Sequence, residues 1–470
     1  MTTDTSVALP TRFRAGEERG ARLGRMLKVA GRVKTVDEEQ MALIGQRFLE
    51  RDTLGADLAS AMRSSGEDKV SMAQFHRALV HGIDSVEAAP PALRDFFAAV
   101  DTMPEWVNFE LINEGARVYR RAGKTGADVL LQLSLLGGYR FGGPTDLLVA
   151  TGGLTGDTTM RRLGETQKWG VAVSEHNGMR RDGEGFQLTV HVRLMHALVN
   201  YRFEGGDRWD IARWGLPINQ SDQAATLGLF NGVFLLGVRA LGVRVTVAES
   251  RAVMHLWKYI GWLMGVNDDW LFETEREQHA FNYHVLLAQD DITEAGPQLA
   301  NGILDAQGRL HFERFERIGR AYTSARLLSM LRPFLGKQSM RELDLPVRLP
   351  WATIVVLGNN LLNHHVLGRT AWGERRLQAR AVRARDTLMY RYFGPDVPEI
   401  GKLAPALPND PLPVSVAPHR TTVEKVNQRV LFVEQSRNRA LPSELFDDPG
   451  FKRPIVFTRT KRGADRVPRS

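Results

Sequence analysis

The apolar positions of residues 186–203 cover the whole circumference of a helix. Phe186, Val192 and Leu198 lie on different sides of a helical wheel, and seven further apolar side chains lie among them. A helix that is apolar on every side is buried rather than lying at a surface. The turn residues Arg-Asp-Gly-Glu-Gly at 181–185 predict that the helix begins just after them. We therefore expect a central buried helix with His196 near its middle.

Other segments show the three-and-four spacing of helices that are apolar on one side. The predicted helices are 37–63, 69–81, 93–100, a segment opened by Pro104, 128–136, a segment that begins at Asp157 or Thr158, a long helix capped by Asn219 or Ser221, 254–263, 273–288, 314–331 and 351–367. No convincing alternation of apolar and polar residues predicts a strand. The pattern therefore predicts an all-α fold. Residues 1 to about 20 show no helical spacing of apolar residues and are expected to be disordered.

Proline content suggests where the parts of the chain begin and end. Ala-Pro-Pro at 89–91 interrupts the helical pattern, and seven prolines fall within residues 395–418. Proline removes a backbone donor and cannot continue a helix, so the later segment is expected to be an extended tail. We predict an N-terminal tail with accessory helices at 1–92, one large helical domain at 93–394 and the Pro-rich tail at 395–470.

Composition excludes several kinds of site. The 470 residues are 43% hydrophobic and 25% charged, as in ordinary globular proteins, and include no cysteine. Disulfides, iron–sulfur clusters, thiolate haem ligation and cysteine nucleophiles are therefore excluded. The formal net charge of +8 allows contact with nucleic acid or a membrane surface, although dense arginine is more often a solvated helix face. No stretch reaches eighteen consecutive apolar residues, so no membrane-spanning helix is expected.

The histidines narrow the possible metal chemistry. None has a glutamate three residues before it, as di-iron bundles require, and no HExxH motif occurs. His191 and His196 are five residues apart, which directs them to different faces of a helix. His196 is then either a hydrogen-bonded core residue or the single protein ligand of a haem iron, for which an apolar slot and one strong ligand suffice.

Five short motifs occur in an order that resembles one known family. They are GGP at 142–144, TGGLTG at 151–156, RRLGET at 161–166, VRLMHA at 192–197 and GLPINQSDQAAT at 215–226. Together they are similar to the latex-clearing proteins, which are rubber oxygenases. These belong to a wider family of haem oxygenases that includes the farnesyl-cleaving enzymes of mycophenolic acid synthesis.

This resemblance implies a globin-reminiscent helical domain that encloses haem b at 93–394. The proximal iron ligand falls on His196, and three distal residues fall on Arg162, Thr166 and Asp146. The distal lysine of rubber oxygenases falls on Glu165, which inverts the charge, and Lys168 is one turn out of register. The departure argues against rubber cleavage but not against haem.

The distal residues also make chemical sense by themselves. Arg162, Glu165 and Thr166 are spaced so that they share one helix face. Arg162 would stabilise negative charge that develops on oxygen, and Asp146 or Glu165 would take or relay a proton. Alternatively, Glu165 only forms an ion pair with Arg162 and takes no part in proton transfer. Of these two roles we favour the proton relay. Without the family pattern, a surface ion pair is the simpler explanation of Arg162 and Glu165. The polar residues at 219–226 are explained by capping and buried hydrogen bonds, with support to haem left open.

The expected function is a cytoplasmic, haem-b-dependent oxygenase that uses dioxygen to oxidise or cleave a carbon–carbon double bond in an apolar, isoprenoid-like small molecule. The N-terminus has no apolar signal-peptide region, and an extracellular polymer would need a secreted enzyme. A haem peroxidase or peroxygenase is the alternative enzyme. The alternative outside the enzymes is a binding protein without catalytic activity. It would bind a membrane or nucleic acid through five arginines, Arg375, Arg376, Arg380, Arg383 and Arg385. No nucleic-acid partner is expected, while peripheral membrane contact and oligomeric state stay open.

Overall fold

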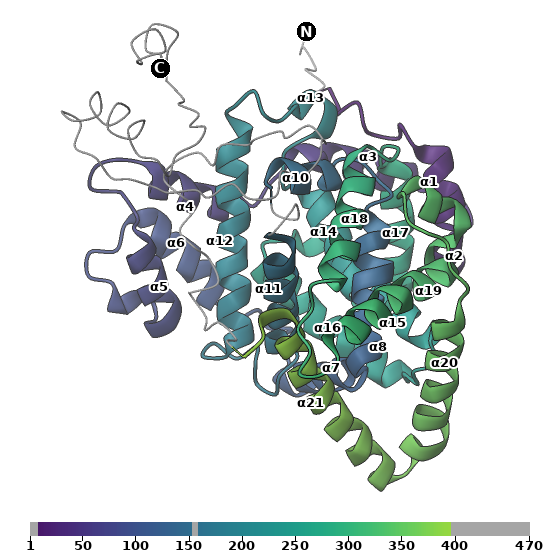
Figure 1. Ribbon diagram of the computed structural model, residues 1–470. Coiled ribbons are helices and arrows are strands. Elements are labelled where there is room, and N and C mark those ends of the chain that lie inside the picture. The colour runs from purple at the N-terminus through teal and green to yellow at the C-terminus, as the bar shows by residue number, and fades with distance from the viewer. Residues whose placement is uncertain (1–7, 153–157, 396–470) are drawn as a thin grey trace, which may run out of the picture. The chain divides into compact units, whose positions relative to one another are not determined.

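The computed structural model describes residues 8–152 and 158–395, and there the chain forms helices and no strand (Figure 1). The all-α prediction is confirmed. The first helices are α1 (Glu17–Leu23), α2 (Arg25–Ala30), α3 (Glu38–Gln46), η1 (Arg47–Leu49), α4 (Thr53–Arg63), α5 (Met72–His81), η2 (Ile83–Ser85), α6 (Pro91–Asp101), α7 (Phe109–Arg121), α8 (Gly123–Val129), the π-helix η3 (Leu130–Leu135), α9 (Leu136–Gly138) and α10 (Pro144–Ala150).

The second half contains the longest helices. They are α11 (Thr158–Val173), α12 (Glu184–Glu204), α13 (Ile211–Trp214), α14 (Gln220–Phe230), α15 (Gly232–Ala240), α16 (Val247–Leu263), η4 (Asp268–Trp270), α17 (Glu275–Ala288), α18 (Ala295–Gln307), α19 (Glu316–Glu342), α20 (Trp351–Asn360), the π-helix η5 (Leu361–Val366), η6 (Leu367–Arg369) and α21 (Ala371–Phe393). The predicted tail from 396 onward lies outside the described residues, as does the predicted cap Asp157.

The apolar segment at 186–203 forms α12, as predicted. α12 packs between α4 and α11 and also contacts α16 (Figure 1). Phe186, Val190 and Leu194 are completely or almost completely buried. His196 and Val199 are only half-buried, so one side of this interior helix is incompletely covered by protein.

The expectation of disorder near the N-terminus is wrong for residues 8–20. The Arg12 side chain is fully buried, and its guanidinium donates to the Asp222 carboxylate at 2.5 Å and 3.3 Å. The Phe48 ring lies 3.8 Å from the guanidinium carbon of Arg12. A buried cation needs such partners, and all of them are distant in sequence. Residues 1–7 lie outside the described part of the chain.

The single helix predicted at 37–63 is also wrong, because the chain turns between α3 and α4. The backbone carbonyls of Phe48 and Glu50 accept hydrogen bonds from Leu216 and Gln220. A carbonyl used in this way leaves the helical ladder. The long helix predicted after Asn219 is likewise interrupted at Asn231, where α14 ends and α15 begins.

Candidate functional site

His196 lies on the incompletely covered side of α12. Its Nδ1 atom is buried, and no hydrogen-bond partner for it occurs among the described residues. The pKa of His196 is lowered to about 4, mainly by burial and also by the charge of Arg162, while Asp52 acts in the opposite direction. The ring is therefore neutral at physiological pH, and a neutral imidazole has a free lone pair for a metal.

A buried ion pair fixes α12 close to His196. Arg193 donates through Nε and Nη2 to the two carboxylate oxygens of Asp52, each at 2.7 Å. Asp52 directly precedes α4, so the pair joins α4 to α12. Gly265 completes this arrangement with a φ of +78°, and a Cβ there would lie 2.8 Å from the Asp52 carboxyl carbon. Two reasons therefore favour glycine at this position, the backbone conformation and the space.

α11 contacts α12 through Trp169, and Arg162 and Thr166 are exposed residues on the same face of α11. Arg162, Thr166 and Trp169 follow one another at intervals of four and three residues and so share a face. Trp169 Nε1 donates to Thr189 Oγ1 of α12 at 3.0 Å, which holds the two helices together. The charge of Arg162 contributes to the lowered pKa of His196, whereas the charge of Asp52 opposes it.

Glu165 is engaged by two arginines. Its Oε1 accepts from Nε of Arg161 at 2.8 Å, and its Oε2 lies 3.8 Å from Nη1 of Arg162. The Glu165 side chain is 16% exposed and that of Arg162 is 53% exposed, so the acid lies deeper than the base. The Thr166 hydroxyl donates to the Arg162 carbonyl at 3.0 Å. Arg162, Glu165 and Thr166 therefore lie on one turn of α11, and Arg162 and Glu165 form the predicted ion pair there.

Asp146 occupies a different position from the other candidates. Its Oδ2 accepts from the Gly143 backbone N–H at 2.9 Å and from the Thr293 hydroxyl at 3.1 Å. These bonds satisfy an otherwise unpaired donor at the start of α10. Asp146 therefore has a structural role in addition to the one suggested by the resemblance.

The structural interpretation of residues 219–226 is confirmed. Asn219 caps α14 by accepting from the Asp222 N–H at 2.9 Å. The Thr226 hydroxyl donates to the Asp222 carbonyl at 2.7 Å, and Gln220 donates to the Gly265 carbonyl at 2.8 Å. This segment therefore links α14 to the turn that supports Arg193.

Sequence reasoning did not identify an aromatic cluster beside the site. Trp169, Phe230 and Trp257 bring α11, α14 and α16 together, with ring centroids 5.0 to 5.7 Å apart. The spacing of Trp169 from Arg162 and Thr166 was a signal in the sequence. Phe230 and Trp257 are distant in sequence, and no local pattern connects them with His196.

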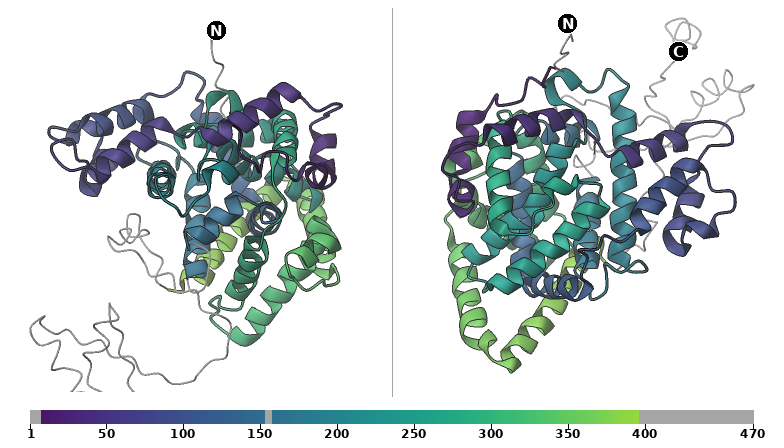
Figure 2. Two further views of the ribbon diagram at one scale, coloured as in Figure 1. Left: turned by 90° about the horizontal axis from the view of Figure 1, so that it is seen from above. Right: turned by 180° about the vertical axis from the view of Figure 1, so that it is seen from behind.

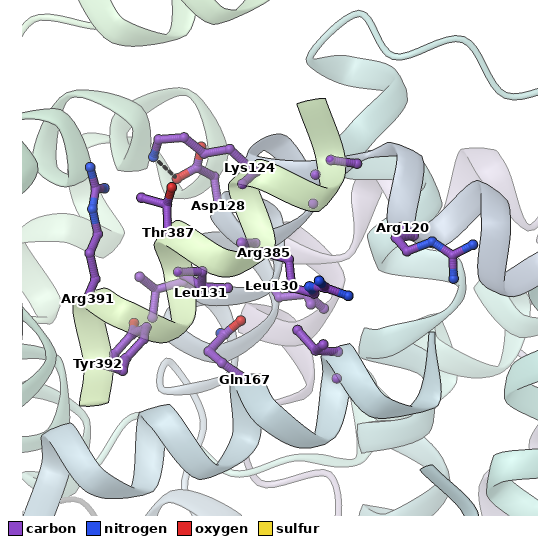
Figure 3. A pocket seen from close by; sticks show the side chains of 18 of the residues that line it. Arg120, Lys124, Asp128, Leu130, Leu131, Gln167, Arg385, Thr387, Arg391 and Tyr392 are labelled. Atoms are coloured by element: carbon purple, nitrogen blue, oxygen red, sulfur yellow. Dashed lines mark ion pairs between the residues drawn. The ribbon is translucent and has the colours of Figure 1, made fainter. Parts of the chain in front are cut away.

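A cavity of about 600 Å³ lies on the other face of α11, between α8, α19 and α21 (Figure 3). Gln167 contributes to it from α11, and Lys124, Arg385 and Arg391 are among its basic residues. Lys124 is paired with Asp128 at 3.5 Å. None of the five predicted site residues lines this cavity. It is therefore separate from the side of α11 that faces His196.

The described residues contain neither a clustered set of metal ligands nor a membrane-spanning helix. No group of three or more His, Asp or Glu side chains lies close enough together to hold a metal ion. No helix in the described ranges is both long and apolar enough to cross a bilayer.

Comparisons with known proteins agree with this architecture. Over 286 residues the chain is 21% identical to the rubber oxygenase of Streptomyces sp. (strain K30), covering 60% of this chain and 70% of that protein. The solved structure of latex clearing protein LCP in the closed state matches with a TM-score of 0.56 and 18% identity. That match covers 72% of this chain and 91% of the LCP chain, and it supports the same all-α fold.

A family profile gives the broadest match. The profile of the catalytic domain described as ER-bound oxygenase mpaB/B'/rubber oxygenase matches residues 117–384, which is more than half of the chain. The match includes α11 and α12 and therefore Arg162 and His196. This chain belongs to the family of mpaB/B' oxygenases and rubber oxygenases.

Proposed function

We propose that the chain is a haem-b-dependent oxygenase whose single protein ligand to the iron is His196. The observation that carries the proposal is a neutral, half-buried imidazole with an unpartnered ring nitrogen on an otherwise apolar helix. One histidine suffices because the porphyrin supplies the in-plane ligands. The donor set therefore fits haem. When bound, haem b would supply an iron centre for the activation of dioxygen.

Arg162 would provide electrostatic stabilisation on the distal side. Its guanidinium is held close enough to His196 to lower the pKa of the imidazole, and half of its side chain stays accessible. A fixed positive charge favours negative charge that develops on oxygen during the reaction. Its partner Glu165 would limit the positions that the guanidinium can take.

Glu165 would move the proton that the reaction requires. Its Oε2 is the atom nearer to Arg162, while Oε1 is occupied by Arg161. Asp146 already accepts two hydrogen bonds at the start of α10, so Glu165 is the better placed of the two acids. The Thr166 hydroxyl would orient a polar atom of substrate or water on the same helix face.

The substrate would be an apolar, isoprenoid-like small molecule with a carbon–carbon double bond. The ring cluster of Trp169, Phe230 and Trp257 makes the contact between α11, α14 and α16 apolar. Isotopically labelled dioxygen tests the proposal with a panel of prenylated compounds. If dioxygen is the oxidant, labelled oxygen enters the products. Products without label, or consumption of no dioxygen, would contradict it.

A peroxidase or peroxygenase is the second candidate, and the Arg162–Glu165 pair is the observation that favours it. An arginine beside an acid polarises a bound peroxide in the same way as it stabilises charge on dioxygen. Turnover with hydrogen peroxide in the absence of dioxygen distinguishes this activity from that of an oxygenase.

A further inference from the structure

Exposed apolar side chains gather in one part of the molecule. Twelve of the twenty large hydrophobic residues that are exposed in the described chain lie between residues 315 and 382. They are Phe315, Ile318, Tyr322, Leu349, Trp351, Ile354, Val355, Leu361, Leu362, Val366, Trp372 and Val382. Scattered exposed hydrophobics are normal in proteins, but a concentration of this size marks an interaction surface.

Most of these residues belong to a hairpin at 349–382, formed by α20, η5, η6 and the start of α21. The two arms form a V that projects from the body, with its apex at η5 and η6 (Figures 1 and 2). Leu361, Leu362 and Val366 lie at this apex, and each is at least 44% exposed. The apolar surface is therefore the most projecting part of the hairpin.

Hydrogen bonds hold the hairpin in this shape. Asn360 donates to the Leu241 carbonyl at 2.8 Å and to the Thr125 hydroxyl at 3.1 Å, which anchors the end of α20 to the body. Arg380 of α21 donates to Asn363 of η5 at 2.8 Å, which joins the two arms. The exposed apolar residues thus belong to a fixed element with defined contacts.

The charged residues around the hairpin are mainly positive. No acidic residue occurs between Asp344 and Glu374. Glu374 itself is paired with Arg117 and Arg121. Six exposed arginines occur in or next to this segment, and three of them (Arg376, Arg380 and Arg383) also line the cavity beside α21; the other three are Arg348, Arg369 and Arg375. A nucleic acid would complement the arginines but not the projecting aliphatic side chains.

We propose that the 349–382 hairpin docks this protein on a bilayer that contains anionic lipids. Leu361, Leu362 and Val366 enter the boundary between headgroups and acyl chains, and the arginines contact lipid phosphates. This combination of an apolar face with flanking cations is how an element lies in a membrane interface without crossing it. Trp351 and Trp372 lie on the exposed arms, and indole favours the interfacial layer. The proposal does not depend on haem binding.

Vesicle flotation of the full chain tests the proposal. Vesicles of equal parts phosphatidylcholine and phosphatidylserine are expected to bind the protein more strongly than vesicles of phosphatidylcholine alone. The double variant Leu362→Gln with Val366→Gln should reduce partitioning by about a hundredfold, since each substitution removes roughly a tenfold apolar contribution. Arg375→Gln with Arg376→Gln should reduce it about thirtyfold on anionic vesicles.

Matched controls come from α1 and α2, which have exposed residues of the same kinds outside the hairpin. Met26→Gln with Val29→Gln removes two exposed apolar side chains, and Arg22→Gln with Arg25→Gln removes two exposed arginines. Both controls should float like the wild type, and circular dichroism of every variant should match the wild type. Lipids brominated on their acyl chains should quench tryptophan fluorescence, and Trp372→Phe should lose part of that quenching.

Three results would overturn the proposal. The first is no flotation of the wild type. The second is flotation that the hairpin variants and the control variants of α1 and α2 reduce equally. The third is a wild-type dimer that the Leu362 and Val366 substitutions convert to a monomer without any change in flotation, because a second copy of the chain would then cover the hairpin.

Discussion

Two properties of the His196 imidazole suit it to metal binding. It is neutral, because burial and the charge of Arg162 lower its pKa to about 4, and its Nδ1 lacks a partner among the described residues. A buried polar atom without a hydrogen bond costs roughly 1–3 kcal/mol. A ligand that uses the ring would offset this cost, which is why the residue suits metal binding.

The first prediction is that His196→Ala loses haem and remains helical. The ring provides the single protein ligand, whereas the helix is stabilised by its apolar neighbours. His191→Ala is the control, because His191 lies on the same helix and stacks on His76 with ring centroids 5.5 Å apart. Absorbance and far-ultraviolet circular dichroism are the measurements. Full haem occupancy in His196→Ala would show that another residue is the ligand.

Arg162→Ala should keep haem and lower turnover by about 10²–10³-fold, the usual effect of removing one preorganised charge-stabilising group. Arg161→Ala is the matched control, because Arg161 also pairs with Glu165 but is not among the charges that shift the pKa of His196. The control should retain activity within about tenfold. Equal losses in the two variants would mean that both arginines act only by holding Glu165.

Glu165→Gln separates the two roles of this acid. The substitution removes charge and basicity and nearly preserves shape. If Glu165 relays a proton, turnover falls and the pH–rate profile loses its acidic limb. If it only restrains Arg162, turnover holds or rises. We expect the first result, and an unchanged rate with an unchanged profile would eliminate the relay.

At the scale of elements, α12 was predictable because its own residues determine its burial. The all-round apolar pattern and the preceding turn are local signals, and the helix lies within two residues of the predicted bounds. The break between α3 and α4 depends instead on carbonyls that bind Leu216 and Gln220, far along the chain. The spacing of neighbouring residues does not predict hydrogen-bond partners so far along the chain.

The pair between Asp52 and Arg193 is expected to support both stability and the site. Asp52→Ala leaves a buried guanidinium without its carboxylate, which should cost about 3–5 kcal/mol of unfolding free energy. The loss should also weaken haem binding, because α12 carries His196 one turn away from Arg193. Urea unfolding followed by circular dichroism measures the first effect. A change below about 1 kcal/mol would show that the pair is solvated.

Across the whole molecule, the sequence predicted the helical class and the buried central helix that carries His196. It did not predict that Arg12 would be buried against Asp222, because an isolated arginine in a polar segment carries no signal of burial. It also did not predict the support from Asp52, since that contact spans 141 positions. The proposed limits at residues 92 and 394 remain predictions.

Stability should fall as the pH decreases from 6.5 toward 4. Burial lowers the pKa of His191, His196 and His364 to about 4 in the folded chain. The unfolded chain binds these protons near pH 6.5, so acid favours unfolding throughout this interval. Urea titrations of the haem-free protein at several pH values measure the effect, and His191→Gln should flatten the dependence. Constant stability between pH 6.5 and 4.5 would contradict it.

The most direct test of the central claim is one absorbance spectrum of the full chain, purified from cells grown with ample haem. The account predicts a Soret band, with haem bound in a ratio near one per chain. Preparations that are folded by circular dichroism yet show no Soret band, even after incubation with haem, would contradict the assignment of His196 as a haem ligand.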